Sequence, residues 1–253
     1  MEGIYDIHTH ILPMVDDGAA SIREALAIIR EESEQGVGAI MLTPHFREKI
    51  FETEVEVICQ RYEELLDAAS ELYPDMDLRL GCELHALSDM KGILEDRNYT
   101  SLDNSKYILL EFSGMDPAEY IRKKTKEVLK LGYCPILAHI ERYPALTNNL
   151  ILIEMLRELG AAMQINADSV LGEGSSQEKR FCHKLLKREI VDFVASDVHN
   201  MTTRRSNIGR AADMIEKKYG REYAERLFIQ NPRHLFAKDE DELCKFNIKK
   251  EKS

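Results

Sequence analysis

The stretch Tyr5-Asp6-Ile7-His8-Thr9-His10 stands near the start of the chain and reads as a short apolar strand that ends in two imidazoles. Side chains alternate along an extended strand, so we expect Asp6, His8 and His10 to point to one face. Two imidazoles and a carboxylate on one edge amount to half of a metal site. The other ligands must then come from elsewhere in the chain.

Six further apolar runs follow, separated by longer amphipathic segments. Ser21 reads as a helix N-cap, with Glu24 completing a capping box. Residues 88–104 are expected to be loop with one helical turn, and Asn231-Pro232 is expected to end the regular pattern. The expected strands cover residues 3–8, 39–42, 78–82, 107–110, 135–138, 162–165 and 190–195, and the expected helices about 21–36, 54–72, 117–131, 150–159, 177–187, 204–219 and 222–228.

Repeated strand–helix units of about 30 residues predict right-handed crossovers and a parallel sheet. From the pattern alone, a closed or distorted barrel and an open doubly wound sheet both fit seven strands. No linker-like composition interrupts the series. We therefore predict one domain over residues 1–238, followed by a charged, flexible tail over residues 239–253.

Composition limits the location and the partners. The net charge of -11 argues against bulk attraction to nucleic acid or an anionic membrane. No apolar run approaches about 18 residues, and no signal-peptide pattern opens the chain, which predicts a cytoplasmic protein without membrane insertion. The cysteines are odd in number and form no CxxC, which predicts free thiols. They are Cys59, Cys82, Cys134, Cys182 and Cys244.

Polar side chains follow directly on the apolar runs. Parallel strands bring their carboxyl ends, and the loops after them, to one edge of the fold. A lone histidine at a strand end is more often structural than a ligand, but six strand ends with such residues are hard to ascribe to chance. The residues in these positions are His8, His10, His45, Glu83, Glu111, His139, Asp197 and His199.

A mixed imidazole and carboxylate set without thiolate excludes a cysteine-type structural zinc site. It suits Mn²⁺, Fe, Zn²⁺ or Mg²⁺ in a catalytic site. The donors exceed the needs of one ion, and Glu83 or Glu111 could bridge two cations about 4 Å apart. Such a centre supplies a hydroxide at neutral pH and clamps a phosphoryl group. The residues therefore predict a multi-metal phosphoester hydrolase.

Two arginines follow closely on predicted ligands. Arg142 comes three residues after His139, and Arg204 comes five residues after His199. Guanidinium groups in these loops would suit phosphate oxygens, although surface loops also carry arginine routinely.

The chain resembles the polymerase and histidinol phosphatase (PHP) superfamily, and more narrowly the bacterial tyrosine-protein phosphatases of the CpsB/YwqE group. The ILPxxDDG and LAHxERY patterns are specific to that group, although Ile140 stands where many members have proline. The resemblance runs in order from residue 4 to about 232. It rests on Asp6-Ile7-His8-Thr9-His10-Ile11-Leu12-Pro13, Val15-Asp16-Asp17-Gly18, Thr43-Pro44-His45, Gly81-Cys82-Glu83, Leu110-Glu111-Phe112, Leu137-Ala138-His139-Ile140-Glu141-Arg142-Tyr143 and Ser196-Asp197-Val198-His199-Asn200.

The resemblance implies a distorted (β/α)7 TIM-like barrel with two to three metal ions, most commonly manganese, at the carboxyl ends of its strands. It implies phosphotyrosine substrates, notably on a cognate bacterial tyrosine kinase that controls capsule or exopolysaccharide synthesis. Asp6 would orient a ligand imidazole. The ligands that it implies are His8, His10, Asp17, His45, Glu83, Glu111, His139, Asp197 and His199.

The resemblance further implies that Arg142, Arg204 and His199 are the catalytic residues, with the two arginines holding the phosphate. Because the family often has proline after the second arginine, either Arg204 or Arg205 could be the one that reaches it. We assign no general acid, since the leaving group is a phenolate, whose conjugate acid has a pKa of about 10, and it can leave without being protonated.

The sequence also admits other interpretations. Cys182 and Arg188 have the Cys-x5-Arg spacing of cysteine-dependent phosphatases, but a helical pattern without glycine offers no phosphate-binding loop. Within the metal class, histidinol phosphatase is the main alternative, and a nucleic-acid exonuclease is disfavoured by the acidic charge. A non-catalytic scaffold that docks on a kinase is the alternative from another class.

Overall fold

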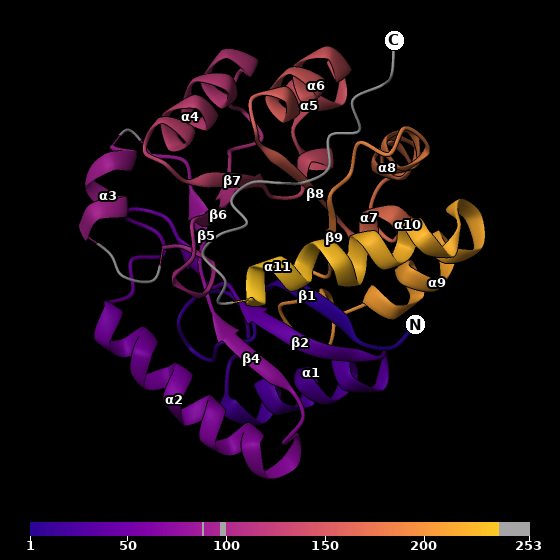
Figure 1. Ribbon diagram of the computed structural model, residues 1–253. Helices are drawn as coiled ribbons and strands as arrows, with labels where there is room; N and C mark the ends of the chain where they lie inside the picture. The colour runs from indigo at the N-terminus through magenta and orange to yellow at the C-terminus, as the bar shows by residue number, and fades with distance from the viewer. Residues whose placement is uncertain (88, 97–99, 238–253) are drawn as a thin grey trace.

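The computed structural model describes residues 1–87, 89–96 and 100–237, whose strands form one curled wall (Figure 1). The strands are β1 (Ile4–Thr9), β2 (Val37–Leu42), β3 (His45–Phe46), β4 (Asp77–Leu80), β5 (Glu83–His85), β6 (Tyr107–Glu111), β7 (Cys134–Leu137), β8 (Ala162–Asn166) and β9 (Phe193–Ala195). They form two sheets, β1-β2-β4 and β3-β5-β6-β7-β8-β9. Every pairing between these strands is parallel.

Two of the predicted strands are each followed, after a two-residue break, by a second short strand. Thr43-Pro44 separates β2 from β3, and Gly81-Cys82 separates β4 from β5. Proline has no N–H to give to a neighbouring strand, and a Cβ on Gly81 would lie 2.8 Å from the Leu102 side chain. Because β3 pairs with β5, the two broken strands continue side by side. The segments therefore occupy the seven predicted strand positions.

The first and last strands meet, and this decides the fold class. The Asp197 N–H donates to the His8 carbonyl at 2.9 Å, and the His10 N–H donates to the Val198 carbonyl at 2.8 Å. Thr9 also forms a parallel bridge with Val198. The wall thus closes into a distorted (β/α)7 barrel, and the predicted fold class is confirmed against the open sheet.

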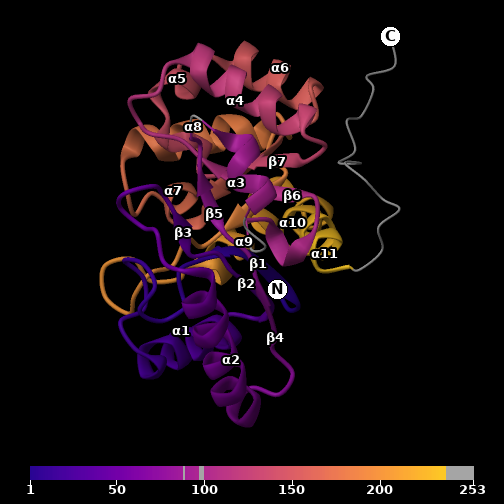
Figure 2. The same ribbon diagram turned by 90° about the vertical axis from the view of Figure 1, so that its left-hand side faces the viewer.

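Helices cover the outside of the barrel (Figures 1 and 2). Ser21 caps the first helix by accepting from the Glu24 N–H, but the Glu24 carboxylate accepts from Ala20, so the predicted capping box is only half formed. The helices are α1 (Ile22–Glu34), α2 (Val55–Leu72), α3 (Met90–Asp96), α4 (Ala118–Lys130), α5 (Pro144–Thr147), α6 (Leu150–Glu158), α7 (Ala167–Leu171), α8 (Ser176–Lys187), α9 (Ile208–Tyr219), α10 (Arg221–Glu225) and α11 (Asn231–Phe236). Two short 3-10 helices, η1 (Leu102–Asn104) and η2 (Ile140–Arg142), and one π-helix, η3 (Arg226–Gln230), complete the series.

Several predicted helix boundaries are wrong. The helix expected from residue 204 begins at Ile208, which leaves the preceding arginines in a loop. Asn231-Pro232 does not end the regular pattern, because α10, η3 and α11 follow one another without a gap (Figure 1). Proline is tolerated at the start of α11, where its missing N–H needs no partner. Between residues 88 and 104 the structure has α3 and η1; residues 88 and 97–99, and the predicted tail over 239–253, lie outside the described residues.

Two apolar clusters form the core. The larger joins strand residues such as Ile108 and Leu110 to helix residues such as Ile121 and Val128. The smaller joins the alternate strand residues, such as Leu109, to α11, and fills the barrel interior. The Phe236 ring of α11 packs on Tyr5 at the beginning of β1, with ring centroids 5.1 Å apart. Because α11 covers the amino ends of the strands, the carboxyl ends remain free for a site.

The cysteines only partly follow the prediction. Cys59, Cys82 and Cys182 form no disulfide, whereas Cys134 is disulfide-bonded, so the expectation of free thiols is wrong there. Within residues 1–87, 89–96 and 100–237, no helix has both the length and the apolar character needed to cross a bilayer.

Candidate metal centre

The predicted ligands converge at the carboxyl ends of the strands. They fall into four groups whose nitrogen and oxygen atoms lie within 4.8 Å of one another, and each of the nine belongs to at least one group. The groups are His10, Asp17, His45 and His199; His8, His10 and Asp197; His8, Glu83 and His139; and His45, Glu83 and Glu111. The fold therefore assembles the whole predicted set in one place.

Glu83, the first residue of β5, lies at the middle of the cluster. Its Oε1 is 2.7 Å from His139 Nε2, and its Oε2 is 2.9 Å from His45 Nδ1 and 3.2 Å from His8 Nε2. The carboxylate is buried. His10 Nε2 lies 3.3 Å from the same Oε2. One buried carboxylate that faces four imidazoles is suited to bridge two cations.

His8 and His10 come from the end of β1 and are both fully buried. Their Nε2 atoms are 3.2 Å apart. Asp197 Oδ1 lies 3.5 Å from the first and 3.4 Å from the second. Two imidazole nitrogens and a carboxylate oxygen thus point at one small volume.

Asp17 stands at the exposed side of the cluster. Its Oδ1 lies 3.6 Å from His45 Nε2 and 3.5 Å from His199 Nε2. The turn that carries it passes so close to β1 that a Cβ on Gly18 would lie 2.0 Å from the His10 carbonyl oxygen. The glycine after the two aspartates is therefore required by this close approach.

Asp16 supports the ligands without being one of the predicted set. Its Oδ2 lies 2.7 Å from His10 Nδ1 and also accepts from the His45 backbone N–H at 2.9 Å. A carboxylate on the far nitrogen of a ligand imidazole fixes the tautomer and the ring orientation. The sequence placed Asp16 beside the site but indicated no role for it.

Gln164 and Tyr143 are two further supports that the sequence analysis missed. Gln164 Oε1 lies 3.3 Å from His8 Nδ1 and accepts from the His139 N–H at 2.8 Å. Tyr143 Oη lies 3.0 Å from His139 Nδ1. The signal for Gln164 was available, because a buried polar residue inside an apolar strand needs a partner.

The role expected for Asp6 is wrong. Its carboxylate accepts from the backbone N–H groups of His8 and Ser196, at 3.3 and 3.1 Å, and not from an imidazole. The register of β1 shifts between Asp6 and Thr9, so the simple alternation does not hold there. Asp6 instead lies beside Glu32 of α1, and burial together with the Asp6 charge raises the pKa of Glu32 well above its ordinary value.

The two predicted arginines meet at one carboxylate. Arg142 Nη1 is 2.9 Å from Asp197 Oδ2, and Arg204 Nη2 is 3.1 Å from both oxygens of the same group. Arg205 pairs instead with Glu31 on the outer surface. Of the neighbouring arginines, Arg204 is therefore the one that faces the centre.

The backbone is unusual at two of the predicted ligands. His139 follows β7 with φ +31° and Asp197 follows β9 with φ +56°. Non-glycine residues in this left-handed region are uncommon and cluster at functional sites. Each turn directs the side chain from a strand end into the cluster.

Burial and neighbouring charges shift the pKa values of several side chains in the cluster. Burial and the charge of Glu83 raise the pKa of Glu111 to about 8. Burial and the charge of His10 lower the pKa of His199 to about 4, although Asp17 acts in the opposite direction. Burial disfavours ionised Asp197, but the imidazoles and the two arginines hold its pKa well below the ordinary value.

This donor set fits divalent cations. His199 Nε2 is buried and has no hydrogen-bond partner among the described residues. With its pKa near 4, it offers a neutral lone pair. The four groups contain imidazole and carboxylate donors and no thiolate, which suits manganese, iron, zinc or magnesium in a catalytic site.

Cys182 does not form a second catalytic site. It lies in α8, is fully buried, and burial raises the pKa of its thiol strongly. Arg188 points to Glu154 on the surface. A protonated thiol inside a helix is no nucleophile, so the Cys-x5-Arg spacing is a coincidence.

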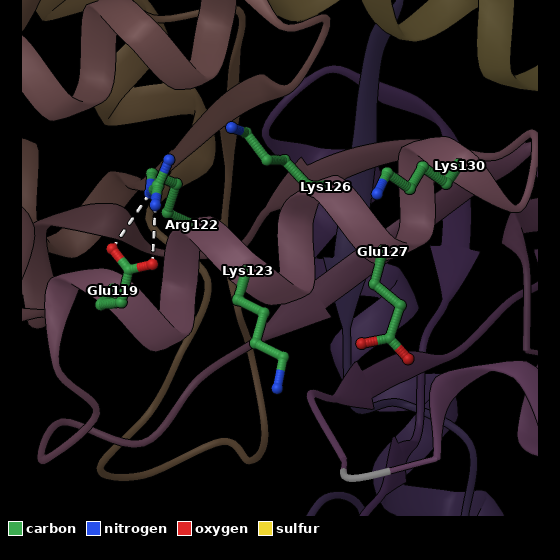
Figure 3. A pocket seen from close by; sticks show the side chains of 6 residues that line it. All are labelled: Glu119, Arg122, Lys123, Lys126, Glu127 and Lys130. Atoms are coloured by element: carbon green, nitrogen blue, oxygen red, sulfur yellow. Dashed lines mark hydrogen bonds and ion pairs between the residues drawn. The ribbon is translucent and has the colours of Figure 1, made fainter.

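A hollow on the outer face of α4 is also separate from the cluster (Figure 3). It is lined by Glu119, Arg122, Lys123, Lys126, Glu127 and Lys130. Arg122 is held by Glu119 at 2.7 Å. None of these six side chains belongs to a ligand group.

Two structural comparisons extend the picture. A crystal structure of YwqE from Bacillus subtilis and CpsB from Streptococcus pneumoniae, described as unique metal-dependent tyrosine phosphatases, matches with a TM-score of 0.85 at 31% identity, covering 92% of this chain and 94% of that one. The phosphotriesterase homology protein from Escherichia coli matches with a TM-score of 0.58 at 10% identity, covering 93% and 99%, which shows a shared fold alone.

Sequence comparisons give the family. The tyrosine-protein phosphatase CpsB of Streptococcus pneumoniae is 37% identical over 91% of this chain and 97% of its own length. The tyrosine-protein phosphatase YwqE of Bacillus subtilis (strain 168) is 32% identical over 86% and 85%. The family model for capsular polysaccharide synthesis, CpsB/CapC, matches residues 4–237. The chain therefore belongs to the CpsB/CapC family of capsular polysaccharide synthesis proteins.

Proposed function

We propose that this protein is a metal-dependent protein-tyrosine phosphatase. One observation carries the proposal. Nine imidazole and carboxylate side chains converge in four groups, and within each group the possible ligand atoms lie within 4.8 Å of one another. Two guanidinium groups lie at the edge of this cluster. Guanidinium groups beside a site for several cations are suited to bind the oxygens of a phosphate monoester. The names of the relatives point to phosphotyrosine as the monoester.

The chain's own residues divide the work as follows. The nine predicted ligands would hold two to three divalent cations, with Glu83 as a bridge. When bound, the cations supply a nucleophile at neutral pH and neutralise phosphoryl charge. Arg142 and Arg204 bind the phosphate oxygens, and Asp197 keeps both guanidinium groups in place. His199 would offer a cation the lone pair of a neutral imidazole, because burial and the charge of His10 lower its pKa to about 4.

The finer assignments extend this proposal. Manganese is the cation that we propose, since the N/O donor set accepts it and the CpsB/YwqE resemblance implies it. The proposed substrate is a phosphotyrosine protein, namely a bacterial tyrosine kinase that controls capsule or exopolysaccharide synthesis. A cytoplasmic location and a single domain over residues 1–238 remain predictions.

Metal analysis combined with kinetics tests the function. We expect the purified protein to contain divalent cations and to hydrolyse a phosphotyrosine peptide faster than the matching phosphoserine peptide. Chelation should abolish turnover and Mn²⁺ should restore it. His199→Ala should lose both metal and activity. The matched control is His183→Ala, since His183 lies on α8 against Tyr219 and outside the centre.

The same assays address the alternatives. Faster turnover of histidinol phosphate than of the phosphotyrosine peptide would favour the histidinol phosphatase reading. A protein that binds cations but hydrolyses no phosphate ester with Mn²⁺ present would be the non-catalytic scaffold. Equal behaviour of the His199 and His183 variants would contradict the assignment of the centre.

A further inference from the structure

A tight turn borders the candidate metal centre directly after β3. The backbone N–H of Phe51 donates to the Arg47 carbonyl at 2.9 Å, and the Arg47 N–H donates to the Phe51 carbonyl at 2.9 Å. Lys49 has φ +64° at the tip of this turn. Farther along, Thr53 Oγ1 donates to the Val15 carbonyl at 2.8 Å, which ties the segment to the loop that carries the paired aspartates. The turn is therefore closed by two backbone bonds, and the segment after it is held by one side-chain bond.

The turn places an aromatic ring on a predicted ligand. The rings of Phe51 and His45 are stacked, with centroids 5.1 Å apart and planes 11° from parallel. Phe51 is only half-buried, and its neighbour Ile50 is 58% exposed. An apolar ring that is not fully covered thus stands at the edge of a strongly polar cluster.

This ring lies near the cationic part of the site. Arg204 Nη1 is 3.7 Å from Asp17 Oδ2, and Asp17 Oδ1 is 3.6 Å from His45 Nε2. Phe51 stacks on that same imidazole. These contacts link Phe51 to Arg204 through His45 and Asp17, so the ring borders the side of the site on which Arg204 would hold a phosphate. Aromatic rings prefer to stack on other rings with offset or tilted geometry.

We propose that Phe51 is the platform for the aromatic ring of the substrate and selects aryl phosphates over alkyl phosphates. This inference rests on the proposed phosphatase function and names the side chain that gives it specificity. A phosphotyrosine ring would stack at this edge of the centre, whereas a phosphoserine side chain has no ring to place there. Phe51 is thus a specificity residue, and the cations and arginines bind the phosphate of either ester.

Kinetics with matched peptides test the platform. In Phe51→Leu, which keeps apolar cover over His45, we expect kcat/KM for a phosphotyrosine peptide to fall about 3- to 10-fold, mainly through KM. Phosphoserine turnover and metal content should stay unchanged, and Phe51→Tyr should keep the wild-type preference. Ile50→Ala is the matched control, because Ile50 is exposed on the same turn and does not stack on the imidazole. A parallel fall for both esters, or a loss of metal, would show that Phe51 only shields the imidazole and would overturn the inference.

A binding measurement separates this inference from the proposed function. By calorimetry, the wild-type protein with Mn²⁺ should bind phenylphosphonate more tightly than methylphosphonate, and Phe51→Leu should lose that difference. If the wild-type protein preferred phenylphosphonate but hydrolysed no ester, the role of Phe51 would be supported and the phosphatase proposal would be wrong. Equal binding of the two phosphonates by the wild-type protein would overturn the platform, whatever the turnover.

Discussion

Replacing Arg204 by alanine should remove most of the activity, whereas replacing its neighbour Arg205 should not. The two residues are adjacent in sequence but face different surroundings. Arg204 Nη2 lies 3.1 Å from both oxygens of Asp197 at the edge of the metal centre. Arg205 lies over α1 and pairs with Glu31. The pair therefore offers a matched comparison of one chemical change at two places.

The expected magnitude follows from the contacts that each guanidinium can make. A charge-assisted hydrogen bond contributes about 1.5–3 kcal/mol, and a fork on a phosphate makes two. Loss of the Arg204 fork should thus lower kcat/KM by about 10²- to 10⁴-fold. In Arg204→Ala, Asp197 would still contact Arg142, at 2.9 Å, and the Asn166 amide, at 2.8 Å. We therefore expect this variant to fold. Arg205→Ala loses an exposed ion pair, worth about 0–1 kcal/mol of stability, and kcat/KM should change little.

The assay is steady-state hydrolysis of a phosphotyrosine peptide with Mn²⁺, alongside metal analysis and thermal unfolding of each variant. Arg204→Lys adds a test of geometry, because lysine keeps the charge but not the planar fork. Retention of near wild-type kcat/KM by a metal-replete Arg204→Ala would refute the reasoning, as would equal losses in the two alanine variants.

Three further changes have defined outcomes. Gly18→Ala would place a methyl group 2.0 Å from the His10 carbonyl, so the turn must move and metal analysis should show lost ions, with kcat/KM down about 100-fold; full occupancy would contradict this. Burial raises the pKa of Glu141 to about 7. Between the ordinary glutamate pKa and about 7, Glu141 therefore keeps its proton in the folded state but loses it in the unfolded chain. The free energy of unfolding should fall by about 3 kcal/mol as the pH rises from about 4 to above 7. In urea unfolding, Glu141→Gln should lack this decline. Cys182→Ser should keep kcat/KM within about twofold, since a buried thiol is protonated, and an inactive variant would reopen the cysteine mechanism.

Much of the fold could be predicted because its signals are local. Each apolar run ended at a polar residue, and parallel topology brings such ends together. From the sequence alone, that reasoning predicts that His45, Glu83 and His139 lie in one cluster, as they do in the structure. The two strand breaks were not predicted, because β3 and β5 are only two and three residues long and carry no periodicity of their own.

The supporting residues were harder to predict than the candidate ligands. Gln164 supports His8 from 156 residues away in sequence, and nothing near it in the chain indicates that partner. Asp16 is six residues from His10, but the adjacent Asp17 offers the same carboxylate, so the sequence does not show which of the two supports the imidazole. Asp6 was assigned wrongly, because period-2 alternation assumes a regular strand and β1 shifts its register. The position of Arg204 depended on where α9 begins, and helix boundaries are the weakest part of a sequence pattern.

The meeting of the first and last strands has a consequence during protein synthesis. The Ser196 N–H donates to the Asp6 carboxylate across 190 residues of sequence, and His8 and Asp197 belong to one ligand group. A ribosome must therefore translate past residue 199 before the ligand set can be complete. Interrupted translation products that stop before β9 would lack the closing strand and part of the centre, so we expect them to have no phosphatase activity. Their unpaired strand edges would also expose them to aggregation and to proteolysis.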